Sequence, residues 1–169
     1  MKFIKTAAAA IVGVGLALSI PLSAQAAVTA QASGAGSLDE GTRHFSFSAK
    51  EAADGTVKGQ ANLVNTSGDG KPFHLTIDIS CLKVVGNIAV FGGIGSKSGD
   101  PLFDGEAVFF TVQDNGEPGK DRDKISRVYA YDFTPNAQGG QPSACLLTPI
   151  TGSEALPLET IESGNIQVK

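Results

Sequence analysis

The chain has 169 residues and a formal net charge of −4 at pH 7, with only two His, two Cys and no Trp. Mild acidity argues against a nucleic-acid-binding protein, and so few His and Cys argue against a multi-cysteine zinc module or a His-rich metalloenzyme. The 21 Gly and 8 Pro indicate many turns, but their share lies below that of disordered chains.

Residues 1–26 have the pattern of a secretory signal peptide. Two lysines within the first five residues precede an apolar run over residues 6–22, and Ala24-Gln25-Ala26 supplies the small residues that signal peptidase recognises. The apolar run is short for a membrane span, and no cysteine directly follows it that could carry a lipid. We therefore expect cleavage before Ala27 and a secreted protein, extracellular or periplasmic, with neither membrane insertion nor a lipid anchor.

A change of composition after this segment introduces an all-β domain. Residues 27–36 are mostly small, which predicts a flexible lead-in, and the folded domain is expected over residues 37–169. Apolar and polar residues then alternate over residues 43–49, 56–64 and 73–81. A period of two predicts strands with one face buried and one face in water.

Gly86-Asn87 predicts a tight hairpin turn, because both residues tolerate positive φ. This turn places Ile79 opposite Ile94. Alternation along the first strand then turns Ile88 and Val90 inward together with Ile94. The opposite face carries another apolar set: Leu82, Val84, Ala89 and Phe91. Either the C-terminal segment covers this second face, or the set forms an apolar surface patch that binds a partner.

The remaining strand signals lie at residues 106–113 and 124–133, and more weakly at 145–150 and 165–169. No segment after the signal peptide has the apolar spacing of three and four that a helix requires. In all, about eight short strands with turn residues between them predict a single antiparallel β-sandwich or an up-and-down β-barrel.

Cys81 and Cys145 are expected to form a disulfide, because two cysteines in an oxidising compartment usually pair. Such a bridge would stabilise the fold by roughly 4 kcal/mol in the chain-entropy model. The alternatives are two buried free thiols or a redox site, and the absence of a CxxC motif argues against the latter.

An acidic segment between two predicted strands is the one candidate metal site. Calcium binds six to eight oxygen atoms, and the segment offers five oxygen-bearing side chains: Asp114, Asn115, Glu117, Asp121 and Asp123. Its spacing departs from the EF-hand pattern, and Lys120 and Arg122 neutralise part of the charge. The alternative is a solvated turn shaped by Gly and Pro. No other cofactor is indicated.

Catalytic motifs are not apparent. His74, Asp78 and Ser80 lie on one predicted strand, where residues four apart are separated by about 13 Å, too far for a triad. The sequence therefore predicts a protein that is not an enzyme. A hydrolase that uses carboxylates such as Asp78 or Asp104 is a remote alternative, and it would require two convergent carboxyl groups with a raised pKa.

Five short blocks of the chain carry a family resemblance: TRHFSF (42–47), ADGTVKGQA (53–61), VVGN (84–87), DNGE (114–117) and SGNIQV (163–168). In this order they resemble uncharacterised exported bacterial proteins related to the post-COAP domain. The resemblance implies a small all-β extracellular module. It brings no established activity and no catalytic residues.

Together these features predict a secreted, non-enzymatic β-domain that acts as a binding or structural accessory module, with a protein or a small apolar molecule as its partner. The alternative is a carrier of a small apolar ligand, whose barrel interior is lined by residues such as Phe45, Phe47, Phe110 and Val112. A cavity of about 300 Å³ or more would favour the carrier, and a filled core would contradict it.

Overall fold

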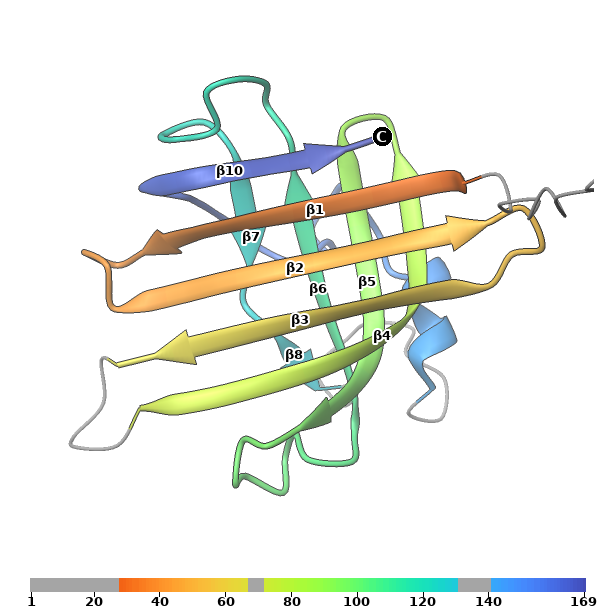
Figure 1. Cartoon of the computed structure of the whole chain (residues 1–169), viewed down its shortest axis with the longest axis horizontal. Helices are drawn as coiled ribbons and strands as arrows, with labels where there is room; N and C mark the ends of the chain where they lie inside the picture. Colours follow the sequence, from red (N-terminus) through yellow and green to blue (C-terminus); the bar gives the residue numbers. More distant parts are fainter. Residues whose placement is uncertain (1–27, 67–71, 131–140) are drawn as a thin grey trace, which may run out of the picture.

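The chain folds into one antiparallel sheet that curls on itself. The computed structural model describes residues 28–66, 72–130 and 141–169. Within these ranges the sheet has ten strands in the order β10-β1-β2-β3-β4-β5-β6-β7-β9, with β8 paired to β6. Figure 1 shows β10, β1, β2 and β3 crossing over β5, β6 and β7, with β4 bending from one layer into the other. The predicted all-β, antiparallel fold is thus confirmed, as a single sheet in the form of a half-barrel.

The strand bounds agree with the sequence pattern where the pattern is strongest. The strands are β1 Val28–Leu38, β2 Arg43–Ala52, β3 Val57–Asn65, β4 Phe73–Val85, β5 Ile88–Ser96, β6 Ala107–Gln113, β7 Lys124–Ser126, β8 Tyr129–Ala130, β9 Leu158–Thr160 and β10 Ser163–Val168. The weak strand predicted at 145–150 is wrong, because a 3-10 helix, η2, spans Pro142–Leu146 there. The strand predicted over 124–133 is divided into β7 and β8, and its last residues lie outside the described ranges.

The flexible lead-in predicted for residues 27–36 is wrong from Val28 onward. This segment belongs to β1, which pairs with both β2 and β10. Packing requires glycine at two of its positions. A Cβ at Gly34 would lie 2.9 Å from the ring of Phe47, and one at Gly36 would lie 2.9 Å from the ring of Phe45. The small residues therefore make room for aromatic rings of the neighbouring strand. The all-β domain begins before residue 37.

A β-bulge in β4 overturns the predicted surface patch. The pairing of β4 with β5 shifts between Ile79 and Cys81, so Ile94 lies opposite Asp78 and is exposed. The extra residue reverses the alternation of side chains beyond it. The set predicted as a patch therefore faces the main core: Leu82, Ala89 and Phe91 are buried there, and Val84 packs against them.

Aromatic rings fill the middle of the curled sheet. The rings of Phe91 and Phe110 stack with their centroids 4.5 Å apart, and Phe47 meets them edge-on at 5.1 Å and 5.7 Å. Val112 is fully buried beside them. A hollow interior lined by Phe47, Phe110 and Val112 is therefore excluded, which contradicts the central cavity expected for a carrier.

The C-terminal segment covers the other face of β4, β5 and β6. Cys81 and Cys145 form a disulfide with a Cα–Cα distance of 6.2 Å, as predicted. Around it a second apolar cluster includes Val90 and Phe109. The contact is close at Gly92, where a Cβ would lie 2.1 Å from the carbonyl oxygen of Pro142. The sequence suggested that the C-terminal segment covers one face of the β4–β5 hairpin. It does so, but the covered face is the one that carries Cys81 and Val90.

Candidate functional site

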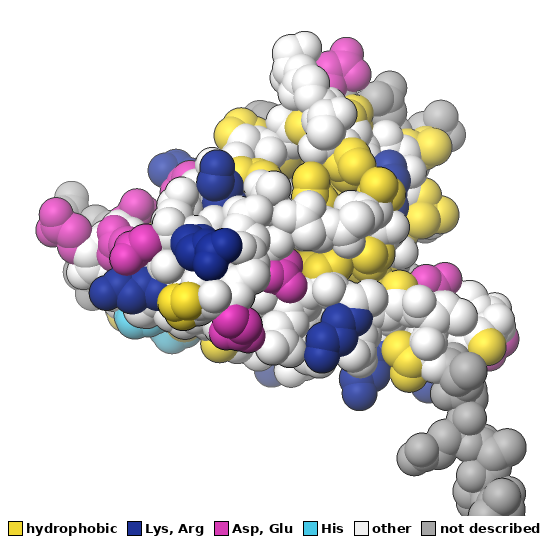
Figure 2. Space-filling model, turned by 90° about the horizontal axis from the view of Figure 1, so that it is seen from above, with side chains coloured by type: hydrophobic (Ala, Val, Ile, Leu, Met, Phe, Trp, Pro, Cys, Tyr) yellow, Lys and Arg dark blue, Asp and Glu magenta, His cyan; other side chains and the backbone are white. Residues whose placement is uncertain are grey.

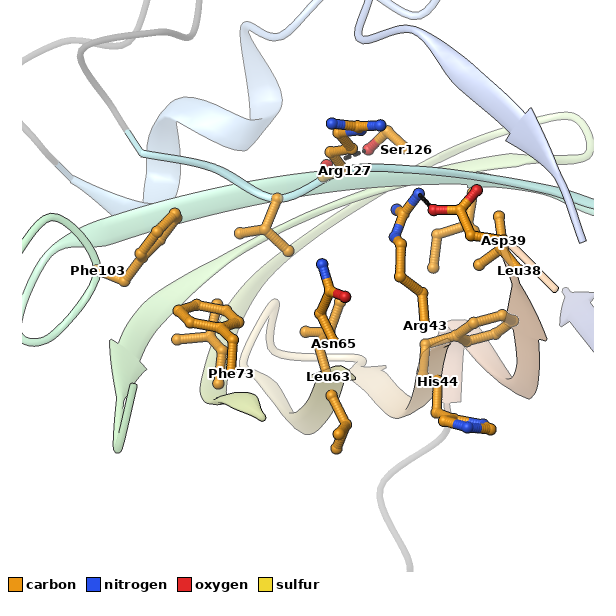
Figure 3. A pocket seen from close by; sticks show the side chains of 15 residues that line it. Leu38, Asp39, Arg43, His44, Leu63, Asn65, Phe73, Phe103, Ser126 and Arg127 are labelled. Carbon is orange, nitrogen blue, oxygen red and sulfur yellow. Dashed lines mark hydrogen bonds and ion pairs between the residues drawn. The ribbon is translucent and has the colours of Figure 1, made fainter. Parts of the chain in front are cut away.

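A pocket of about 270 Å³ opens at the end of the sheet where β2 begins and β3 ends. The strands of one layer meet β7 and the β5–β6 loop there (Figure 3). The wall is polar and apolar in about equal parts, and its apolar side chains include Leu38, Leu63, Phe73, Leu75, Phe103 and Ile125. Of the residues expected to line a cavity, only Phe45 borders this space. The pocket lies beside the filled core.

Strand register explains why these side chains share one space. Arg43 lies opposite Asn65, and Asn65 lies opposite Phe73. Directly opposed residues of antiparallel strands project to the same face, so the three form one row at the mouth of the pocket. Figure 3 shows them pointing into the same space from neighbouring strands. A second row, formed by Phe45, Leu63 and Leu75, continues the same face toward the core.

The far wall is set by the loop between β5 and β6. Phe103 of this loop packs edge-on against Phe73, with the ring centroids 5.5 Å apart. The carboxylate of Asp104 holds the loop by accepting hydrogen bonds from the backbone N–H groups of Ser98 and Gly99, at 2.8 Å and 2.9 Å. The Ser98 N–H bond is the main reason why the pKa of Asp104 lies below its ordinary value.

Four charged side chains form an ion-pair cluster at the polar end of the pocket. Arg43 Nη1 lies 3.1 Å from Asp39 Oδ2 and also contacts Glu159 Oε2. The second oxygen of Glu159 lies 2.9 Å from Arg127 Nε. Two guanidinium groups thus face two carboxylates, and their formal charges cancel.

The shifts in pKa within this cluster follow from the same contacts. Burial by itself raises the pKa of Glu159, but the hydrogen bonds from Arg127 and Arg43 outweigh it, so the net shift is downward. The hydrogen bond to Glu159 in turn raises the pKa of Arg127. Both shifts favour the charged forms of Glu159 and Arg127, so the ion pair between them is kept at neutral pH.

The acidic segment proposed as a calcium site is used to hold the edge of β10. The buried Asp123 accepts hydrogen bonds from the backbone N–H groups of Asn115 and Ile166, both at 2.8 Å. Asp114 accepts one from the N–H of Val168 at 3.0 Å. Two carboxylates thus bind the edge of β10 at alternate residues, as the carbonyl groups of a neighbouring strand would.

The rest of this segment has similar contacts. Glu117 Oε1 accepts hydrogen bonds from the side-chain amides of Asn165 and Gln167, and the backbone N–H of Asp121 donates to the carbonyl of Ile161. In the described ranges no group of three or more His, Cys, Asp or Glu side chains gathers as a metal site would require. The calcium site therefore remains a prediction without structural support.

The carboxylates of the hydrolase alternative gain no support either. Asp78 is exposed on the outer face of β4, and Asp104 has a lowered pKa where catalysis would need a raised one. Sequence reasoning missed the pocket and its charged cluster. The only local signal is a charged residue, Arg43, at the start of a strand, whose partner Glu159 lies 116 positions away.

A second, more open hollow lies over β2 and β3, beside Ser46, Ser48, Gln60 and Asn62. Seen from above in Figure 2, charged side chains of both signs are interspersed, and apolar side chains gather in one area. The most exposed large apolar side chains in the described ranges are Leu146 and Leu147, both more than half exposed. Nothing in the structure indicates what would cover them, so we place no site there.

Comparison with protein-family models, curated proteins and solved structures found no match. The resemblance to post-COAP-related proteins therefore stays a prediction. The signal peptide predicted at residues 1–26 lies outside the described ranges. Within those ranges no helix has the length and apolarity needed to cross a membrane.

Proposed function

We propose that this protein is a secreted, non-enzymatic binding module that holds a small ligand with an apolar body in the pocket between Arg43 and Phe103. The observation that carries the proposal is the pocket itself, which combines apolar side chains with a polar, charged end in a volume of about 270 Å³. Small-molecule sites are typically concave and mostly apolar, with a few polar groups that orient the ligand. The volume is near the lower limit of such sites, which favours a small ligand.

Secretion is supported by the disulfide between Cys81 and Cys145. Disulfides persist mainly in oxidising compartments such as the periplasm and the extracellular space. A filled core is compatible with a structural module that attaches to a larger assembly. That role, however, leaves the pocket unexplained. The binding function is therefore preferred.

Filling the pocket tests this proposal. Leu63→Trp places an indole among the apolar walls and is expected to weaken binding of n-octanol at least about tenfold, because the ligand and the ring compete for one volume. The matched control is Leu147→Trp, the same substitution at an exposed site outside the pocket. Binding is measured by saturation-transfer NMR and isothermal titration. Equal affinity in both variants, or no binding of octanol by the unmodified protein, would contradict the proposed function.

A further inference from the structure

The charged cluster at the polar end of the pocket restricts the kind of ligand that can enter. A free carboxylate on the ligand would approach Arg43, but it would also meet Asp39 and Glu159, which already contact the same guanidinium nitrogen. Each of these carboxylates repels an incoming anion, and the repulsion is strong in a site that is partly screened from water. The net charge of the cluster therefore gives an anion no advantage.

A ligand cation fares no better. Arg43 occupies one oxygen of Asp39 and one of Glu159, and Arg127 occupies the other oxygen of Glu159. Only the second oxygen of Asp39 is left to accept from an ammonium group without breaking an ion pair, and both guanidinium groups would repel the ligand's positive charge. The pocket thus penalises either sign of charge.

The cluster nevertheless offers hydrogen-bond donors. A guanidinium group has five N–H donors and no acceptor, and both carboxylate contacts of Arg43 use Nη1. Among the described residues, Nε and Nη2 make no ion pair. The Arg43 side chain is only 14% exposed, and it points into the pocket in Figure 3. Its remaining donors therefore face the space where the polar end of a ligand would lie.

We infer that the pocket selects uncharged amphipathic ligands: an apolar chain or ring that carries an amide, ester or similar carbonyl acceptor at one end. The apolar part lies against Leu63, Phe73 and Phe103, and the carbonyl oxygen accepts a hydrogen bond from Arg43. This inference rests on the proposed function and specifies its ligand class. A volume of 270 Å³ equals that of about nine water molecules at about 30 Å³ each, so the ligand is small.

Three ligands of equal chain length test the inference: octanamide, octanoate and octylamine, titrated into the purified protein at pH 7 by isothermal titration calorimetry. Octanamide is expected to bind at least about fivefold more tightly than either charged analogue. Asp39→Asn removes one negative charge from the cluster. It retains a residue that tolerates the left-handed backbone at this position, where φ is 53°. The variant is expected to bind octanoate about three- to fivefold more tightly, a gain larger than any change in its affinity for octanamide.

The control is Asp78→Asn, which makes the same change of charge on the outer face of β4 and leaves both affinities unchanged. Octanoate or octylamine binding as tightly as octanamide would overturn the inference and leave the proposed function intact. So would an Asp39→Asn variant that does not favour octanoate. If octanol and all three probes fail to bind, the proposed function is itself wrong, and the inference falls with it.

Discussion

Asp114 and Asp123 connect the acidic segment to β10 by hydrogen bonds, and Asp123 is the more constrained of the two. Its side chain is fully buried, and each oxygen accepts a hydrogen bond from a backbone N–H, one within its own loop and one in β10. A carboxylate suits this position because it has two acceptor oxygens and no donor. The local charge of the segment is thus explained by hydrogen bonding within the fold.

Asp123→Asn should therefore destabilise the protein by about 2 to 3 kcal/mol, because the new NH₂ group would face a backbone N–H that loses its acceptor. Chemical denaturation, followed by circular dichroism, measures the change in the free energy of unfolding. Asp121→Asn is the matched control, since Asp121 is exposed and Asn tolerates its positive φ. A loss of less than about 0.5 kcal/mol in Asp123→Asn, the range of ordinary surface substitutions, would contradict this role.

Asp104 makes the wall of the pocket sensitive to acid. Hydrogen bonds from Ser98, first its backbone N–H and then its hydroxyl, lower the pKa of Asp104 from its ordinary value of 3.8. A lowered pKa in the folded state means that the contribution to stability is present above pH 3.8 and is lost as the pH falls through the folded value. Near pH 7 the loop that carries Phe103 is therefore held in place.

The amide resonances of Ser98 and Gly99 are expected to titrate with a midpoint below pH 3.8 in an NMR series, because their acceptor is protonated there. Asp104→Asn should abolish this titration and leave the amide of Thr56, which bonds to Asp54, titrating as before. A midpoint at or above the ordinary value would show that these hydrogen bonds do not hold the carboxylate in its charged form.

At the scale of elements, the bulge in β4 and the helix η2 depend on each other. The bulge turns Cys81 away from the main core and toward the outer face of the second layer. There Cys145 of η2 meets it, and Gly92 leaves space for Pro142. The disulfide thus fastens a short helix to β4, and a second apolar cluster forms around the bond.

Replacing both cysteines by alanine should lower the free energy of unfolding by roughly 3 to 4 kcal/mol, since the bridge closes a chain separation of 64 residues. Urea denaturation of the oxidised protein and the Cys81→Ala, Cys145→Ala variant provides the comparison. A reducing agent should destabilise the unmodified protein to a similar degree and leave the variant unchanged. An equal effect of the reducing agent on both proteins would argue against the bridge as its cause.

At the scale of the whole molecule, the curled sheet has a filled middle and an open end. Stacked phenylalanines occupy the middle, while β2, β3 and β4 extend beyond β7 and leave a pocket between the layers. The connection between β9 and β10 joins the two ends of the sheet. In it the backbone N–H of Glu162 donates to the carbonyl of Ser37 in β1, and the backbone N–H of Ile161 donates to the carbonyl of Asp123. A ligand is therefore expected to bind at the open end of the curled sheet and not in its filled middle.

How far the sequence predicts this molecule depends on the range of the interaction. Alternation over 73–79 and the turn at Gly86-Asn87 are local signals, and both are confirmed. The bulge beyond Ile79 has no comparable signal, so the faces of Leu82 and Phe91 were assigned in reverse. The pocket was missed because its charged partners, Arg43 and Glu159, meet only after the sheet has curled.

The sequence by itself determined the all-β class, most strand positions and the cysteine pair, because a period of two, turn residues and an even cysteine count are properties of neighbouring residues or of composition. Only the tertiary structure decided which face of β4 is buried, why β1 consists largely of small residues, and where the space for a ligand lies. Those features depend on contacts between segments far apart in the chain: aromatic rings over glycines, carboxylates on a strand edge, and a balanced ion-pair cluster beside an apolar wall.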